Sequence, residues 1–345
     1  MQKVEEIYWL RAYGCIAVFL FHWLDHINQR VDNVVTDLMR IPLVLGTPIF
    51  LFISIFVFAV RYNKQVPSGF LGQRVKYVML PYLVYGLIYS TAEWVRLQNS
   101  DEPVGFISNA TEYFVFAGWH GYFLIIAMQF YTAYWLFTRW QLWRFDPMPW
   151  LWGSCIVSMA YWGLAYWLEV APPGYLLWIA PLGWVYLFFL ALALVRYYLL
   201  MPSAVSQTEA VQLPAWIRVL ARPGWLMGLV VGIVMATFAG WLAFSSKEVW
   251  VIPFFVLFTL WAMRHLKGRR APPWVRYINA YSFGIYLAHP MFFAITDFFV
   301  GPTALPLAIY AVLLIVVGGV GSIALNKMAN TTTWGAMLFG KRLKV

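Results

Sequence analysis

Long apolar stretches recur along the chain, and short polar segments separate them. Stretches of about 17–25 mostly apolar residues are typical of helices that cross a lipid bilayer. The pattern therefore predicts an all-α polytopic membrane protein with about ten transmembrane helices. The ten expected spans are residues 7–25, 41–60, 77–95, 119–138, 149–168, 178–198, 225–244, 249–264, 280–297 and 304–325.

Composition supports this class. Hydrophobic residues make up 62% of the chain and charged residues only 11%, which is too little charge for the surface of a water-soluble domain. Cys15 and Cys155 both lie in apolar runs, so we expect inert thiols and no metal site. Glu5 and Glu6 precede the first apolar run, and no small-residue cleavage site follows it, so we expect the first span to be retained.

The basic residues predict the orientation. If the N-terminus is cytoplasmic, 19 of the 24 lysines and arginines fall on the cytoplasmic side of the ten spans. This bias follows the positive-inside rule and places both termini in the cytoplasm. Since the basic residues are divided among many loops, the net charge of +10 does not indicate nucleic-acid binding.

We expect one transmembrane domain over residues 1–345. Two polar connections stand out: a cytoplasmic linker near 199–224, with room for a short surface helix, and an external segment near 97–118. The external segment is rich in aromatic residues, which favours a helix lying in the membrane interface. Membrane lipid is therefore an expected partner.

The first span, "IYWLRAYGCIAVFLFHWLDH" from Ile7, contains Arg11 and His22. Eleven residues of α-helix make about three turns, so both side chains lie on one face, about 16 Å apart along the axis. Asp25 and His26 follow His22 at the spacing of neighbours on a helix. The span thus has a polar stripe, but Arg11 near a helix end could also reach the headgroups, and His22 could be an ordinary interfacial residue.

Several stretches resemble, in the same order, the acyltransferase-3 family of membrane proteins. Arginine and histidine eleven positions apart on the first span are similar to that family's signature. The remaining matches are "GTPIFLFISIFVFA" from Gly46, "RVKYVMLPYLVYG" from Arg74, "WHGYFLIIAMQFY" from Trp119 and "NAYSFGIYLAHP" from Asn279. The "HGYF…QFY" form leans toward the branch that modifies poly-N-acetylglucosamine exopolysaccharide.

The resemblance implies O-acyl transfer in the cytoplasmic membrane of a bacterium. The donor would be cytoplasmic acetyl-CoA or succinyl-CoA, and the acceptor an external glycan hydroxyl, in association with a polysaccharide synthase complex or without one. His22 would act as general base, with Asp25 or Glu93 orienting it, or would carry the acyl group itself. Arg74 and Lys76 would hold the CoA phosphates and Arg11 the thioester end or a succinyl carboxylate.

Other polar residues have two interpretations each. Glu93 lies near the outer end of the third span. It is either a functional carboxylate inside the membrane or, if the span ends earlier, a carboxylate in contact with water. We consider His120, Gln129, Tyr82 and His289 as substrate-binding residues, but interfacial packing or hydrogen bonds between helices explain them as well. His289 precedes Pro290, so it could serve the backbone that the proline disrupts.

Two other functions remain open from the sequence. An exporter or flippase of a polysaccharide or glycolipid could use the same polar stripe as a passage. A structural subunit of a polysaccharide synthase would need neither Arg11 nor His22 for chemistry. Transfer chemistry that depends on His22 distinguishes the acyltransferase from both.

Overall fold

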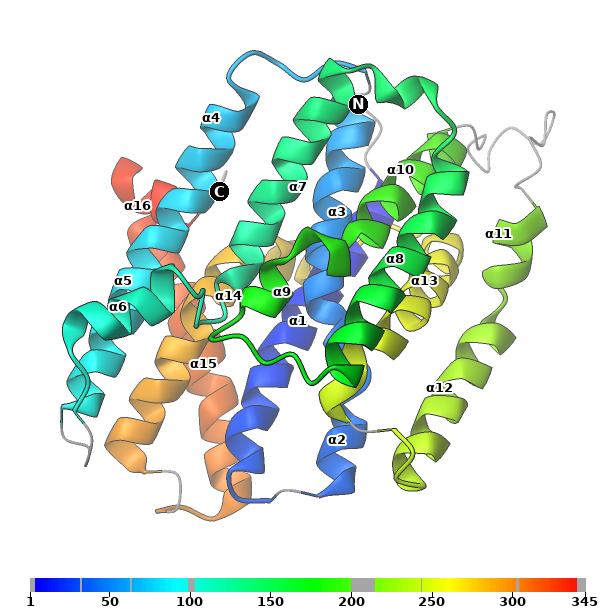
Figure 1. Ribbon diagram of the computed structural model, residues 1–345. Coiled ribbons are helices and arrows are strands. Elements are labelled where there is room, and N and C mark those ends of the chain that lie inside the picture. The colour runs from blue at the N-terminus through cyan, green and yellow to red at the C-terminus, as the bar shows by residue number, and fades with distance from the viewer. Residues whose placement is uncertain are drawn as a thin grey trace. The chain divides into compact units, whose positions relative to one another are not determined.

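The computed structural model describes residues 4–31, 33–62, 64–98, 103–199, 215–242, 244–301 and 304–339 (Figure 1). Within these ranges the secondary structure is helical and contains no β-strand, which confirms the all-α prediction. Most of the predicted linker, residues 200–214, and residues 99–102 of the predicted external segment lie outside the described residues.

Every one of the ten predicted spans contains a helix. Five helical segments of the described residues are long and apolar enough to cross a membrane: Glu5–Asn28, Val34–Tyr62, Phe244–His265, Pro273–Val300 and Leu307–Ala329. The helices at 185–196 and 223–238 are apolar but shorter. A membrane protein is therefore supported, while ten crossings and cytoplasmic termini stay predictions.

The chain divides into two compact units. That both belong to one transmembrane domain stays a prediction from the sequence. The first unit comprises Met1–Gln65, Thr138–Leu168 and Leu182–Ser282. Its helices are α1 (Glu5–Asn28), α2 (Val34–Arg40), α3 (Gly46–Tyr62), α8 (Pro147–Trp167), α10 (Val185–Leu199), α11 (Ala215–Leu220), α12 (Pro223–Phe238) and α13 (Lys247–His265). Short 3-10 turns cover Leu43–Leu45, Leu142–Arg144 and Phe244–Ser246.

Helix α3 forms the centre of the first unit and packs against α1 and α10. Most of its side chains are buried, and Phe52 and Phe56 are fully buried, while one stripe along the helix is partly exposed: Thr47, Phe50, Ser54, Val57 and Val60. Two glycines allow α1 and α3 to approach closely. A Cβ on Gly14 would lie 2.8 Å from Ile49 Cγ2, and one on Gly46 would lie 2.5 Å from Val18 Cγ2.

The first turn of α1 is anchored by its two glutamates. The Glu5 carboxylate pairs with Arg276 at 2.7 Å and accepts the backbone N–H of Ala271 at 2.9 Å. Buried Glu6 accepts the N–H of Gly268 at 3.3 Å. Acidic groups are favourable at a helix N-terminus, so the residues that argue against a signal peptide fix the start of α1.

The second unit comprises Val66–Phe137, Glu169–Pro181 and Phe283–Val345. Helix α14 (Pro273–Val300) begins in the first unit and continues into the second. The other elements are α4 (Phe70–Arg74), a π-helix at Val75–Met79, α5 (Leu80–Leu97), α6 (Phe106–Phe114), α7 (Tyr122–Arg139), α9 (Leu176–Ile179), α15 (Leu307–Ala329) and α16 (Thr333–Leu338). The last two residues of α7 belong to the first unit, and a 3-10 turn at Pro181–Gly183 begins in the second unit and ends in the first. Helix α6 lies in the predicted external segment and packs against α5.

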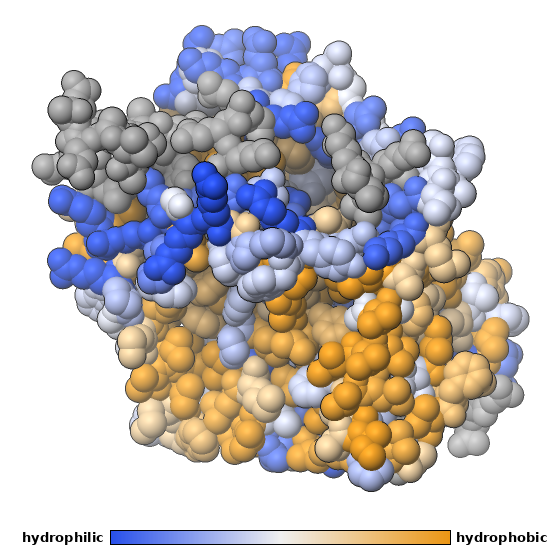
Figure 2. All heavy atoms as spheres, turned by 180° about the vertical axis from the view of Figure 1, so that it is seen from behind, coloured by the Kyte–Doolittle hydropathy of each residue, from blue (hydrophilic) through white to orange (hydrophobic). Residues whose placement is uncertain are grey.

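Large apolar side chains are exposed on both units, and Figure 2 shows broad hydrophobic areas on the face it presents. Exposed apolar residues run along α12 (Trp225, Met227, Val231, Met235, Phe238) and along α15 (Ile309, Val312, Ile315, Val316, Val320). Water would penalise such surfaces, whereas acyl chains accommodate them. The exposed apolar faces therefore agree with a membrane location.

Candidate active site

Arg11 and His22 are both on α1, and both side chains are partly buried. Because α1 is a continuous helix from Glu5 to Asn28, Arg11 and His22, which are eleven residues apart, lie on the same face of the helix.

His22 leads into a short chain of charged groups in the first unit. Its Nδ1 lies 3.3 Å from Oδ2 of Asp25, three residues further along α1. The other Asp25 oxygen, Oδ1, accepts a hydrogen bond of 2.6 Å from Arg40 at the end of α2. Asp25 therefore connects the imidazole to the guanidinium group, and the neighbour predicted from helical spacing is in place.

Arg40 is held from several sides and is only 14% exposed. Its guanidinium carbon lies 5.6 Å from the ring centre of Phe21 and 5.5 Å from that of Phe244. With its oxygen turned toward Arg40, the Asn28 amide accepts from both terminal nitrogens at 3.0 Å and donates to Thr36. These contacts fix a planar cation that matches carboxylate geometry.

The turn between α1 and α2 has a local cause. Asn33 caps α2 by accepting the N–H groups of Val35 and Thr36 at 2.9 and 3.3 Å, while Thr36 completes a capping box. Helix α2 therefore starts soon after α1 ends, and Arg40 at its last turn returns to Asp25. Helical spacing within the first span cannot reveal this contact, because Arg40 lies beyond the turn that follows α1.

This geometry suits proton transfer. A carboxylate beside Nδ1 favours the tautomer with the proton on that nitrogen, which leaves the lone pair of the neutral ring on Nε2. When Nε2 accepts a proton, Asp25 stabilises the imidazolium. Arg40 balances the Asp25 charge and fixes its position, so His22 has the partners that a general base requires.

Two other candidate histidines lie together in the second unit. The ring centres of His120 and His289 are 6.0 Å apart. His289 is fully buried, and its Nδ1 lies 2.7 Å from the carbonyl oxygen of Ile285. Since a carbonyl only accepts, this nitrogen donates. His289 thus bonds the backbone of its own helix, as its position before a proline allows.

Aromatic rings surround His120. Trp119, Tyr89 and Tyr286 all meet its ring edge to face, with centre distances of 4.9, 5.0 and 5.6 Å. The Tyr286 hydroxyl also donates to the His120 carbonyl oxygen. Aromatic neighbours and the hydrogen bond to its backbone carbonyl therefore position His120.

Tyr89 bonds α14 at the turn that contains Pro290. Its hydroxyl donates to the carbonyl of Leu287 at 2.8 Å and accepts the N–H of Met291 at 3.2 Å. Proline lacks an N–H and disturbs the helical turn before it, so a side chain that bonds the adjacent groups stabilises that turn. Sequence patterns do not reveal this role of Tyr89, because Leu287 lies 198 residues away along the chain.

The remaining substrate candidates have different surroundings. Tyr82 is buried, stacks on Trp119 at 5.3 Å and donates to the Tyr113 carbonyl at 3.3 Å. Gln129 is partly buried on α7. Tyr82 thus connects α5 to the segment that carries Trp119 and His120, and substrate binding by Tyr82 and Gln129 stays a prediction.

Arg74 and Lys76 mark a change of helix type. Arg74 ends α4 and lies over the Phe70 ring at 5.0 Å, and exposed Lys76 falls in the π-helix that follows. The Leu80 N–H bonds to the Val75 carbonyl, five residues back. A π-turn just before Pro81 relieves the clash of the proline ring with the preceding turn. Such irregular turns are frequent at functional sites.

Glu93 has its own cation. Both of its carboxylate oxygens accept hydrogen bonds from Arg96, at 2.8 and 2.6 Å. Asp25 is the carboxylate that the first unit places beside His22. The predicted role of Glu93 in orienting His22 therefore stays a prediction.

Comparison with known proteins identifies the class. The model of a family described as an acyltransferase domain matches residues 4–327, nearly the whole chain. The chain belongs to the acyltransferase-3 family, as its motifs predict. Membership indicates a membrane acyltransferase.

Individual relatives are more distant. A Bacillus subtilis protein, YfiQ, provisionally named as a membrane-bound acyltransferase, is 25% identical over 98% of this chain and 95% of its own length. Probable poly-β-1,6-N-acetyl-D-glucosamine export proteins are 28% identical in Staphylococcus aureus, over 94% of this chain and 93% of theirs, and 26% in Staphylococcus epidermidis, over 91% and 88%. No solved structure matches the chain.

Proposed function

We propose that this protein is an O-acyltransferase that moves an acetyl or succinyl group from cytoplasmic acyl-CoA to a hydroxyl of an extracytoplasmic glycan. The observation that carries the proposal is the connection of His22 through Asp25 to Arg40. Family membership supports acyl transfer as the reaction class. The names of the staphylococcal relatives favour a poly-N-acetylglucosamine acceptor.

His22 Nε2 removes the proton of the sugar hydroxyl, and the oxygen attacks the thioester carbonyl. The carbon–sulfur bond breaks, an ester forms, and the CoA sulfur takes the proton from the imidazolium. Asp25 stabilises the imidazolium between these steps. In the alternative, Nε2 attacks the thioester carbonyl and the CoA thiolate leaves; the sugar hydroxyl then attacks the acyl-imidazole, an ester forms, the neutral imidazole is restored and the hydroxyl proton passes to the thiolate.

The donor is held by cations. Arg74 and Lys76 bind the CoA phosphates, since both lie in the basic segment predicted on the cytoplasmic side. Arg11, on the same face of α1 as His22, binds the thioester end of the donor or the carboxylate of a succinyl group. The enzyme works in the cytoplasmic membrane of a bacterium, where a polysaccharide synthase complex supplies the glycan.

The test uses purified protein in lipid nanodiscs with labelled acetyl-CoA or succinyl-CoA and a β-1,6-linked N-acetylglucosamine oligosaccharide. We expect His22→Ala to lower transfer by a factor of about 100 or more. His265→Ala is the matched control, because His265 is exposed and stacks on Trp261, one turn earlier on α13. Equal transfer by His22→Ala and wild type would refute the proposal.

Export of the polysaccharide is the second candidate function, favoured by the names of the staphylococcal relatives. Proteoliposomes separate the two functions. An exporter moves labelled glycan across the bilayer without acyl-CoA and tolerates His22→Gln. An acyltransferase consumes acyl-CoA, leaves an ester on the glycan and loses this activity with the same substitution.

A further inference from the structure

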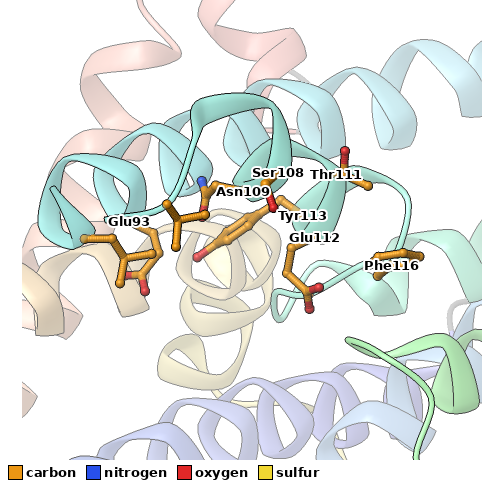
Figure 3. Close-up of a pocket in the computed structure, with 10 residues that line it drawn as sticks. Glu93, Ser108, Asn109, Thr111, Glu112, Tyr113 and Phe116 are labelled. Carbon is orange, nitrogen blue, oxygen red and sulfur yellow. The ribbon is translucent and has the colours of Figure 1, made fainter. Parts of the chain in front are cut away.

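An open pocket of about 560 Å³ lies between α5, α6 and the segment after α6, all within the second unit (Figure 3). Its lining combines hydroxyl, amide, carboxylate and aromatic groups: Glu93, Leu97, Val104, Ser108, Asn109, Thr111, Glu112, Tyr113, Phe116 and Gly118. Groups of this mixture can bond the hydroxyls of a sugar and cover its apolar faces.

The pocket wall is held by specific contacts. The buried Asn109 amide donates to the Ser90 carbonyl at 2.6 Å and to its hydroxyl at 3.0 Å, which fixes α6 on α5. The Gly118 N–H donates to the Glu112 carbonyl at 2.8 Å. A Cβ on Gly118 would lie 2.7 Å from Glu112 Oε1, so a glycine leaves the room that this carboxylate occupies.

The two carboxylates differ in their charge balance. Glu93 is neutralised by Arg96. Glu112 forms no ion pair with any residue in the described part of the chain. The pocket therefore has one uncompensated negative charge, and a ligand that brings a positive group to Glu112 gains a charge-assisted hydrogen bond.

Tyr113 lies between these carboxylates in Figure 3. Burial, reinforced by the charge of Glu93, raises the pKa of Tyr113 to about 12. Its hydroxyl is therefore protonated at neutral pH and remains a hydrogen-bond donor. A donor beside an anionic group matches a ligand that has both hydroxyl and ammonium groups.

We propose that this pocket binds a glycan through a sugar that has a free amino group, with the ammonium at Glu112 and hydroxyls at Ser108, Thr111 and Tyr113. The inference rests on the proposed function, because it assigns the acceptor a docking site. Glu93 then acts as part of this binding site, and the pocket sets which glycan is chosen rather than how the acyl group is transferred.

The test measures binding of two β-1,6-linked tetrasaccharides to the full chain in nanodiscs by calorimetry at pH 6. One is glucosamine with free amines, and the other is fully N-acetylated. We expect Glu112→Gln to weaken binding of the free-amine tetrasaccharide about tenfold. Glu112→Asp should retain most of the affinity. Glu169→Gln, in an exposed carboxylate of the same unit outside the pocket, should leave it unchanged.

The acetylated tetrasaccharide should bind wild type more weakly and be insensitive to Glu112→Gln. Equal affinity of wild type for the two tetrasaccharides, or an unaltered affinity of Glu112→Gln, overturns the inference. His22→Ala separates this result from the proposed function: it should bind the free-amine tetrasaccharide normally while its transfer is lost. Normal transfer by His22→Ala would refute the proposed function, whereas the Glu112 comparison alone decides the pocket.

Discussion

His22 and His289 are both histidines on long helices, yet their surroundings differ in kind. His22 is linked to a carboxylate, and through it to an arginine that lies close to two aromatic rings. His289 is fully buried and bonds a backbone carbonyl of its own helix. The His22 imidazole has a charged partner that can stabilise its protonated form. The His289 ring instead donates a hydrogen bond to the Ile285 carbonyl, in the turn before Pro290.

The difference shows that residue type and a family motif do not by themselves identify a catalytic group. A general base needs a partner that stabilises its protonated form, and Asp25 is in that position beside His22. A histidine bonded to a carbonyl is better suited to rigidity. We therefore expect substitutions in the two regions to affect different quantities.

The largest effect is expected at His22. His22→Gln keeps a polar side chain of similar size but cannot take up a proton, so acyl transfer should fall by a factor of about 100 or more. The melting temperature in detergent should stay within a few degrees of wild type, because the side chain is partly exposed. Labelled-acyl transfer and a thermal melt on the same preparation check both values.

Asp25→Asn should have the next largest effect. An amide can still contact both His22 and Arg40, but it does not stabilise the imidazolium, so transfer should fall on the order of 30-fold. The substitution leaves Asp37, at 3.6 Å, as the charged partner of Arg40. Steady-state rates at saturating donor measure the effect, and an unchanged rate would separate Asp25 from the chemistry.

His289→Ala should act on stability. The change removes the donor to Ile285 and leaves a space in a fully buried position, so unfolding should become easier by about 2 kcal/mol. Transfer per folded molecule should remain within about tenfold of wild type. Denaturant titration followed by helicity measures the free energy of unfolding. A rate loss of more than tenfold without destabilisation would assign His289 to the chemistry.

Tyr89→Phe is the mildest test. It keeps the ring against His120 but removes the hydroxyl that bonds Leu287 and Met291 across the Pro290 turn. We expect a loss of about 1 kcal/mol in stability. Tyr85→Phe serves as a comparison on the same helix, and equal stability of both variants would mean that the bonds of Tyr89 to α14 contribute nothing.

The sequence predicts those parts of this arrangement that depend on one helix. Apolar length locates a helix in every expected span, and helical spacing places Asp25 beside His22. Arg40 is missed because its contact depends on the turn capped by Asn33 and on Phe244, which is distant in the chain. Contacts of that kind are fixed by tertiary packing, which periodicity does not encode.

The same limit applies to the second unit. Pro290 signals a disturbed turn in the sequence, but nothing near it indicates that Tyr89 supplies the hydrogen bonds. Arg96, three residues from Glu93, donates to both of its carboxylate oxygens. An ion pair at that spacing on a helix can be predicted from the sequence, whereas a contact of Glu93 with a histidine elsewhere in the chain depends on tertiary packing.

The most direct test of the central claim measures transfer rate and unfolding free energy for His22→Gln and His289→Ala in one lipid environment. We expect opposite effects: His22→Gln loses acyl-transfer rate and keeps its unfolding free energy, whereas His289→Ala loses unfolding free energy and keeps most of the rate per folded molecule. If His22→Gln transfers the acyl group as fast as wild type, the assignment of His22 as the base is wrong.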